Sequence, residues 1–235
     1  MAALARLTVQ GLMKSFCLHL QGDVRLKVLD DISFGLADGE CLVIRGPSGL
    51  GKSTLLRLVY GNYQAEAGEI FIRHQDKTVD LAQAASREVL AVRKHTMSYV
   101  SQFLRCLPRI SALDVVAEPL QTVGVELEAA RHRAAQLLSR LAIPERLFEV
   151  PPATFSGGEQ QRVNIARSLV CEPSLLLIDE PTASLDVANR DRVLTLFNEH
   201  RDRGAAILAV IHDSGSAAQL QTRTLDIREL RASNP

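Results

Sequence analysis

The stretch GPSGLGKST, residues 46–54, decides the fold of this chain. It follows an apolar run, CLVIR, and it precedes LLRLVYG, which is expected to be helical and to end at Gly61. This order predicts a buried parallel strand, a glycine loop and a helix, and the loop fits the pattern GxxxxGK[ST]. Glycines permit the backbone torsions that aim successive N–H groups at phosphate oxygens, and the helix N-terminus adds its dipole. We therefore predict a phosphate-binding loop in which Lys52 reaches the β- and γ-phosphates and Ser53 binds Mg²⁺.

Strands and helices alternate along most of the chain. Two further apolar runs, SLLLID and AAILAVI, predict buried strands, and helical stretches separate them. This alternation predicts a parallel α/β sheet. The first forty residues predict short strands, whereas helices dominate from about 104 to 170, where Leu127, Ala130 and Leu138 recur at helical spacing as predicted core residues. We expect one domain, 1–235, with an α/β core from 1–103 and 171–235 and an inserted helical subdomain.

Polar side chains end three of the predicted strands. Asp179 and Glu180 follow the run LLLI, His212 follows AAILAVI, and Gln102 ends TMSYVSQ. The carboxyl ends of parallel strands meet at one edge of a sheet, where ligands bind in open α/β folds. We predict that Asp179 holds Mg²⁺ through water, that Glu180 takes a proton from the attacking water, and that His212 contacts the γ-phosphate. The amide of Gln102 is expected to reach Mg²⁺ or the water.

A second polar stretch, TFSGGEQQR at residues 154–162, lies where another helix is expected to begin. Ser156 is a candidate N-cap and Glu159 follows at the capping-box spacing, so a well-capped helix is one interpretation. Two adjacent glycines, Gly157 and Gly158, weaken a first helical turn, but they suit a backbone that a ligand must approach closely. Since free N–H groups at a helix N-terminus bind anions, we predict a second phosphate contact here.

Composition limits the classes of function. The 235 residues suffice for one large domain with its own core, and 46% apolar and 23% charged residues are ordinary for a soluble globular protein. The 27 basic and 27 acidic residues balance, so no global charge favours nucleic acid or an anionic membrane. We therefore expect no nucleic-acid partner.

Cysteines and apolar runs bear on the location of the protein. The cysteines, Cys17, Cys41, Cys106 and Cys171, show no metal-ligand spacing, which favours reduced thiols in a cytoplasmic protein. The first ten residues are not expected to form a signal peptide. The longest clean apolar run, AAILAVI, is far shorter than the about 18 residues that a membrane span requires. We expect a cytoplasmic protein without a transmembrane segment.

Together, these motifs resemble those of the nucleotide-binding domain of ABC (ATP-binding cassette) ATPases, over nearly the whole chain. In the family's order, GPSGLGKST resembles Walker A, Gln102 the Q-loop, FSGGEQ the signature, LLLIDEP Walker B, SLD the D-loop and His212 the H-loop. The signature departs from LSGGQ, because it starts with Phe155 and has Glu159 before Gln160. The resemblance implies a P-loop NTPase of ABC type, with a mostly parallel core sheet, an N-terminal antiparallel β subdomain and an inserted α-helical signature subdomain.

The resemblance also implies how the two phosphate-binding stretches are used. In ABC ATPases the signature of one subunit faces the Walker A motif of another, and two ATP molecules lie between subunits arranged head to tail. This chain carries each motif once, so it needs a second nucleotide-binding domain, its own copy or a homologue. ATP and Mg²⁺ are the implied cofactors. The resemblance implies that Phe16 stacks on adenine. The other residues implied to bind nucleotide are Gly46, Pro47, Ser48, Gly49, Gly51, Lys52, Ser53, Thr54, Ser156, Gly157, Gly158, Glu159 and Asp186. The residues implied to bind the metal are Ser53, Gln102 and Asp179, and those implied for catalysis are Glu180, His212 and Gln102.

Longer stretches resemble one subfamily. LRLVYGNYQAEAGEIFIRH, VSQFLRCLPRISALDVV, PATFSGGEQQRVNIARSLV and RGAAILAVIHD are similar to the L subunit of the bacterial phosphonate carbon–phosphorus lyase system. This resemblance implies a soluble assembly with other carbon–phosphorus lyase subunits, which forms ribose 1-phosphonate 5-triphosphate from ATP and a phosphonate. In that ribose 1-methylphosphonate 5-triphosphate synthase complex, the chain is expected to hydrolyse ATP and remodel the larger enzyme.

Two alternatives stay open. The layout of residues 107–115 is similar to exporter ATPases of the lipoprotein-release and macrolide-export type, which drive membrane subunits through a groove beside the Q-loop. The surface of residues 103–116 distinguishes this alternative from the lyase interpretation. A module that closes on ATP without hydrolysing it is the other alternative. A pure scaffold, however, has no chemical need for all four of Lys52, Asp179, Glu180 and His212.

Overall fold

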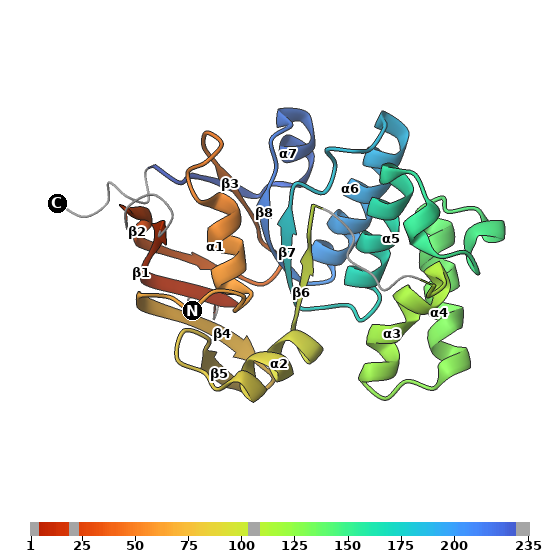
Figure 1. Ribbon diagram of the computed structural model, residues 1–235, viewed down its shortest axis with the longest axis horizontal. Coiled ribbons are helices and arrows are strands. Elements are labelled where there is room, and N and C mark those ends of the chain that lie inside the picture. Colours follow the sequence, from red (N-terminus) through yellow and green to blue (C-terminus); the bar gives the residue numbers. More distant parts are fainter. Residues whose placement is uncertain (1–4, 19–23, 103–108, 229–235) are drawn as a thin grey trace.

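The computed structural model describes residues 5–18, 24–102 and 109–228, which fold around two sheets (Figure 1). Within these residues, a five-stranded parallel sheet has the order β6-β7-β8-β3-β9, and a four-stranded antiparallel sheet has the order β2-β1-β4-β5. The predicted combination of a parallel core sheet and an N-terminal antiparallel sheet is confirmed. The strands are β1 (Leu7–Leu18), β2 (Val24–Leu36), β3 (Cys41–Arg45), β4 (Ala67–His74), β5 (Lys77–Asp80), β6 (Met97–Val100), β7 (Leu175–Asp179), β8 (Ala206–Val210) and β9 (Arg223–Asp226). The helices are α1 (Lys52–Val59), α2 (Ser86–His95), α3 (Ala112–Thr122), α4 (Leu127–Arg140), α5 (Gly157–Leu169), α6 (Val187–Asp202) and α7 (Ser214–Leu220), with short 3₁₀ turns η2 (Glu145–Leu147) and η3 (Pro152–Thr154).

The central strands bury both of their faces, each in a different core. In β7, Leu175 and Leu177 pack into a sheet-side core with β1, β2, β4 and α1. Leu176 and Ile178 point to the opposite face, because side chains alternate along a strand, and they pack into a helix-side core with α3 to α6. Burial on both faces explains the uninterrupted apolar runs from which the sequence predicts these strands.

Helices α3, α4 and α5 follow β6 in the sequence, precede β7, and lie together at one end of the molecule (Figure 1). Ala130 and Leu138 of α4 are buried, as the helical spacing predicts. Leu127 is not part of the core, because its side chain is 46% exposed at the first residue of α4. The spacing identifies the buried face of this helix correctly, but the first turn extends beyond the neighbours that cover that face.

The first strand is longer than the sequence predicts. Alternation of apolar residues covers LTVQGL, whereas β1 continues to Leu18 and pairs with both β2 and β4. Gly11 has a φ angle of 58°, and the register with β2 shifts between Val9 and Leu12. This bulge absorbs an extra residue, so the strand continues beyond the point where the alternating pattern breaks.

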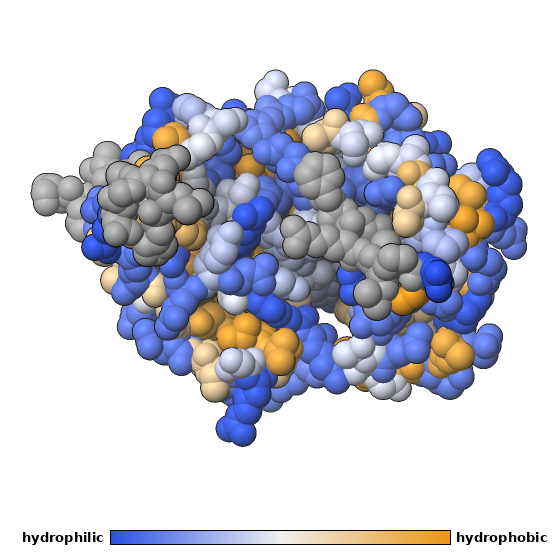
Figure 2. Space-filling model, viewed as in Figure 1, coloured by the Kyte–Doolittle hydropathy of each residue, from blue (hydrophilic) through white to orange (hydrophobic). Residues whose placement is uncertain are grey.

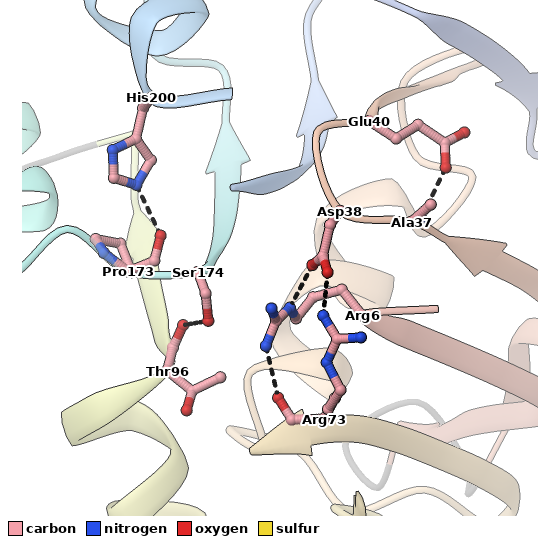
Figure 3. A network of polar contacts seen from close by, with 9 residues as sticks. All are labelled: Arg6, Ala37, Asp38, Glu40, Arg73, Thr96, Pro173, Ser174 and His200. Carbon is pink, nitrogen blue, oxygen red and sulfur yellow. Dashed lines mark hydrogen bonds and ion pairs between the residues drawn. The ribbon is translucent and has the colours of Figure 1, made fainter. Parts of the chain in front are cut away.

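Polar contacts hold the amino-terminal edge of the parallel sheet, where β3, β6 and β7 begin (Figure 3). Asp38, in the turn before β3, accepts hydrogen bonds from Arg6 and Arg73 of the antiparallel sheet. Ser174, before β7, donates to the carbonyl oxygen of Thr96, before β6, at 3.4 Å. The Asp38 contacts therefore fasten the antiparallel sheet to the turn before β3, whereas the Ser174 contact joins β6 and β7 within the parallel sheet.

His200, in the last turn of α6, is buried with both ring nitrogens in use. Its Nε2 donates to the carbonyl oxygen of Pro173 at 2.7 Å (Figure 3), and its Nδ1 accepts from Arg203 Nη2 at 3.2 Å. Burial lowers the pKa of this imidazole below the ordinary value of 6.5, and the charge of Arg203 lowers the pKa further. The hydrogen bond to Pro173 acts in the opposite direction. The folded chain therefore favours neutral His200.

Acid is expected to destabilise the fold through His200. As the pH falls below 6.5, the unfolded chain takes up a proton that folded His200 accepts only at lower pH, so the free energy of unfolding decreases. The urea midpoint, measured above and below that pH, should fall less for His200→Gln than for the unsubstituted chain. His74, whose pKa is also lowered by burial, contributes equally in both chains. An equal fall in the two chains would contradict the assignment.

No helix among the described residues combines the length and the apolar character that crossing a membrane requires.

Candidate active site

The loop at residues 46–51 joins β3 to α1 and closes tightly over the start of that helix. Gly46 and Gly51 have φ angles of 138° and 90°, which strain any residue with a Cβ. A Cβ on Gly51 would lie 2.6 Å from Val28 Cγ1, and one on Gly46 would lie 2.8 Å from Ile227 Cγ2. Both positions therefore require glycine, as the phosphate-binding pattern predicts.

Lys52 places a buried ammonium group inside this loop. Its Nζ donates to the carbonyl oxygens of Gly46 and Pro47, both at 2.7 Å. Burial lowers the pKa of this ammonium, and the carboxylates of Glu180, Asp179 and Asp226 oppose that effect. A buried cation surrounded by glycine backbone and facing carboxylates matches a site for phosphates with a divalent metal, so the residues fit MgATP.

Ser53 and Asp179 meet across the gap between α1 and β7. The Ser53 hydroxyl donates to Asp179 Oδ1 at 2.9 Å, and Asp179 is buried. The phenol of Tyr99, in β6, donates to Asp179 Oδ2 at 2.8 Å. A hydroxyl beside a carboxylate at the end of a phosphate loop is the oxygen ligand set that Mg²⁺ prefers.

Glu180 and His212 form the adjacent pair. Glu180 Oε1 lies 2.8 Å from His212 Nε2, and the Glu180 backbone N–H donates to the carbonyl oxygen of Val210. Glu180 has a φ angle of 51°, a left-handed conformation that is uncommon for residues other than glycine. The turn directs the carboxylate of Glu180 away from the strand and toward His212, so the structure brings together Lys52, Ser53, Asp179, Glu180 and His212.

A groove of about 1000 Å³ adjoins this site. Its lining includes Ser53, Tyr99, Gln102 and Asp179 from the carboxyl edge of the sheet, and Leu90 from α2. Figure 2 shows the hollow between α2 and α3. Gln102 thus lies where the candidate metal residues meet the groove. Of the surface predicted to distinguish lyase from exporter, residues 103–108 lie outside the described residues.

The glycine-rich stretch at residues 156–158 lies elsewhere in the chain. Ser156 caps α5, its hydroxyl accepts from the Glu159 N–H, and Glu159 Oε2 accepts from the Ser156 N–H at 2.9 Å. The expected capping box is therefore present. In Figure 1, β6 and β7 separate α5 from α1, so this stretch and Lys52 do not meet in one chain.

The start of α5 contacts the turn before α6. A Cβ on Gly158 would lie 3.1 Å from the carbonyl oxygen of Ser184, whereas one on Gly157 would meet nothing within 4 Å. Asp186 caps α6, with Oδ1 accepting from the Asn189 N–H at 2.8 Å. Gly158, at the start of α5, is therefore a neighbour of the turn that leads to Asp186.

Phe16 lies on β1 with its ring against that of Tyr63. The ring centroids are 5.5 Å apart in an edge-on arrangement, and Lys14 Nζ lies 5.2 Å from the Phe16 centroid. Its stacking on adenine stays a prediction.

Comparison with known proteins identifies this set of motifs. The family described as ABC transporter matches residues 29–183, which include the glycine loop, the capped stretch at 156–158 and the Asp179–Glu180 pair. The chain belongs to the ABC transporter ATPase family. ABC ATPase domains bind ATP with Mg²⁺ and hydrolyse it, which confirms the general activity predicted from the sequence.

Curated relatives of this ABC ATPase share one name. The lipoprotein-releasing system ATP-binding protein LolD of Idiomarina loihiensis is 38% identical over 218 residues, with 92% of each chain covered. Its namesake from Maricaulis maris is 41% identical over 196 residues and 83% of each chain. A Shewanella protein of the same name is 37% identical and covers 91% of this chain and 90% of its own.

Solved ABC cassettes have the same fold. The dimeric post-hydrolysis structure of the ATP-binding cassette MJ0796, bound to ADP and Pi, superimposes with a TM-score of 0.85 at 27% identity. It covers 94% of this chain and 93% of its own. A second dimeric structure of that bacterial ABC transporter cassette gives a TM-score of 0.84. The similarity shows the ABC ATPase fold, and cassettes of this kind form dimers.

The relatives correct one prediction from the sequence. The resemblance to the carbon–phosphorus lyase L subunit predicted a soluble, phosphonate-degrading complex, whereas relatives at 37–41% identity are lipoprotein-releasing ATP-binding proteins. These findings favour the exporter alternative. Three of the four stretches that suggested the lyase subunit contain Gln102, the signature or His212. ABC ATPases share these motifs whatever their partner, so the stretches distinguish subfamilies poorly.

Two polar residues near the site were not predicted from the sequence. Tyr99 donates to Asp179, and Asp226, at the end of β9, adds a carboxylate that acts on Lys52. The sequence places Tyr99 shortly before Gln102, but its contact with Asp179 depends on the pairing of β6 with β7, which the sequence pattern does not give. Asp226 gave no comparable signal, because it follows a short strand without an apolar run.

Proposed function

We propose that this chain is the ATPase subunit of an ABC exporter of the lipoprotein-release and macrolide-export type. The relatives carry this proposal, since their similarity covers 83–92% of this chain and their names describe lipoprotein release. The chain, 1–235, acts as one ABC ATPase domain at the cytoplasmic side of a membrane partner, with the helical subdomain at about 104–170. It pairs head to tail with a second copy or a homologue.

The chain's own residues have distinct roles in this proposal. Lys52 exchanges the carbonyl oxygens of its loop for the β- and γ-phosphates of ATP. Ser53 and Asp179 hold Mg²⁺, with Gln102 at the same edge, and Mg²⁺ bound there neutralises charge on the phosphate oxygens. Glu180 accepts the proton of the attacking water, and its partner His212 contacts the γ-phosphate.

The second subunit completes each site in this proposal. Ser156, Gly157 and Gly158 present the free end of α5 to the nucleotide held by the other subunit's Lys52. This arrangement is supported by the separation of α5 from α1 within the chain and by the dimeric state of the similar cassette.

The groove beside Gln102 is the proposed docking site of the membrane subunit. Its wall includes α3, whose N-cap is formed by Ser111 and Asp114 of the exporter-like layout, with Ser111 Oγ donating to Asp114 Oδ2 at 2.7 Å. Leu90 on the opposite wall is 60% exposed, a large apolar side chain that a partner would cover.

Purification of the tagged chain from its host membranes tests the proposal. We expect an integral membrane protein to co-purify after detergent extraction, and Leu90→Glu should abolish its recovery. Leu127→Glu is the matched control, because Leu127 is also an exposed helical leucine, 46% exposed, but does not line the groove. Recovery in detergent-free fractions without any membrane protein would refute the exporter assignment.

A further inference from the structure

The two carboxylate oxygens of Asp179 have different partners. Oδ1 accepts from the Ser53 hydroxyl at 2.9 Å, on the side of the glycine loop. Oδ2 accepts from the Tyr99 hydroxyl at 2.8 Å, on the side of β6. Because Asp179 is buried, these two bonds fix the rotation of its carboxylate. The bond to Tyr99 leaves Oδ1 as the oxygen that faces the candidate metal position.

The Tyr99 hydroxyl is the donor in this contact, because an ionised carboxylate oxygen can only accept a hydrogen bond.

An aromatic cluster holds Tyr99 from the groove side. Its ring lies 5.2 Å from that of Tyr60, and the Arg93 guanidinium stands 4.3 Å from the Tyr60 centroid. Arg57 donates to Tyr63 at 3.2 Å and also bonds Tyr99. All five residues line the groove. A molecule seated in the groove would therefore touch the cluster that orients Tyr99.

We propose that Tyr99 is a positioning residue for the metal, because its hydroxyl holds Asp179 Oδ2 so that Oδ1 is presented to Mg²⁺ together with Ser53. This inference rests on the proposed metal role of Asp179, and it adds that the groove and the metal site share one hydrogen-bonded residue. Outer partners that orient a metal-binding carboxylate usually change metal affinity about 10- to 100-fold when they are removed.

The first test is the Mg²⁺ dependence of ATP hydrolysis. Tyr99→Phe keeps the ring and removes only the donor, so we expect the Mg²⁺ concentration for half-maximal rate to rise about tenfold. At saturating Mg²⁺, the rate of Tyr99→Phe should return to within about twofold of the unsubstituted rate, because Asp179 can still hold the metal when the Mg²⁺ concentration is high enough. A structural defect would instead lower the rate at every Mg²⁺ concentration. Tyr60→Phe is the matched control, because it removes a hydroxyl from the same groove wall that does not contact Asp179.

The tyrosines also allow a test that does not depend on turnover. The chain contains 3 tyrosines, all in this cluster, and no tryptophan, so its intrinsic emission reports on Tyr60, Tyr63 and Tyr99 alone. Mg²⁺ held beside Oδ1 would withdraw charge from the carboxylate that accepts the Tyr99 proton. We expect adding Mg²⁺ to the ATP-bound chain to change the emission of the unsubstituted chain and of Tyr60→Phe, and to leave Tyr99→Phe unchanged.

The outcomes separate this inference from the proposed function. An unchanged Mg²⁺ requirement in Tyr99→Phe, or an equal shift in Tyr60→Phe, would overturn the positioning role. If neither the rate nor the emission of the unsubstituted chain responds to Mg²⁺, the metal site itself is wrong and the inference is overturned with it. A raised Mg²⁺ requirement and a lost emission response in Tyr99→Phe alone, with an unchanged thermal melting curve, support the proposal.

Discussion

Glu180→Gln is expected to reduce ATP hydrolysis by about 10²- to 10⁴-fold and to leave ATP binding intact. Glutamine has nearly the same shape, and its amide oxygen can still accept from His212 Nε2, which lies 2.8 Å from Glu180 Oε1. The amide cannot take a proton from water, so only the chemical step is lost. Phosphate release at saturating ATP measures the decrease in the hydrolysis rate. Binding of a labelled ATP measures the affinity for ATP, which is expected to be retained.

Glu172→Gln is the control for this change. Glu172 is a second glutamate with a left-handed backbone, φ 49° against 51° for Glu180, but it lies on the surface and pairs with Arg203. Its substitution should leave hydrolysis within about twofold, because surface ion pairs contribute little. Hydrolysis by Glu180→Gln at the unsubstituted rate would refute the role of general base.

Gly157→Val is expected to abolish the ATP-dependent dimer and to lower hydrolysis by about 10²- to 10³-fold. A Cβ at this position meets nothing within 4 Å in the chain, and Gly157 has no positive φ, so the substituted chain should fold normally. In the proposed dimer the same Cβ would occupy the approach to the partner's nucleotide. Sedimentation with ATP in the Glu180→Gln background measures the dimer directly.

Gly35→Val is the matched control, since a Cβ on Gly35 also meets nothing within 4 Å and Gly35 lies on β2, away from α5. It should dimerise as the unsubstituted chain does. Binding of ATP by the isolated monomer should be equal in both variants. A stable Gly157→Val dimer that hydrolyses ATP would show that α5 does not face the second nucleotide.

The ATP-binding edge could be predicted from sequence because local chemistry determines it. A glycine loop between an apolar strand and a helix, and carboxylates at the end of LLLI, require no knowledge of distant contacts, and the structure places Lys52, Ser53 and Asp179 side by side. The separation of Ser156 from Lys52 was also implied, although by the family resemblance and not by the local pattern.

Other features depend on contacts between distant segments and could not be predicted. The bond between Tyr99 and Asp179 requires the register of β6 against β7, which a sequence pattern does not specify. The length of β1 depends on the bulge at Gly11. The proposed membrane partner would dock near α3, whereas Gln102, the signature and His212 are motifs that ABC ATPases share, so these motifs were a poor guide to the subfamily.

The double-sided burial of the central strands has a consequence for how the chain can be divided. The helix-side core combines Val115, Leu138 and Val163 of the inserted helices with Ile178 and Ala209 of the sheet. Cutting out the inserted helices would uncover the part of one sheet face that α6 and α7 do not cover, and the excised fragment would carry only its own share of that core. The insertion is thus continuous in sequence without being an autonomous folding unit, and it cannot be transplanted between cassettes as a module.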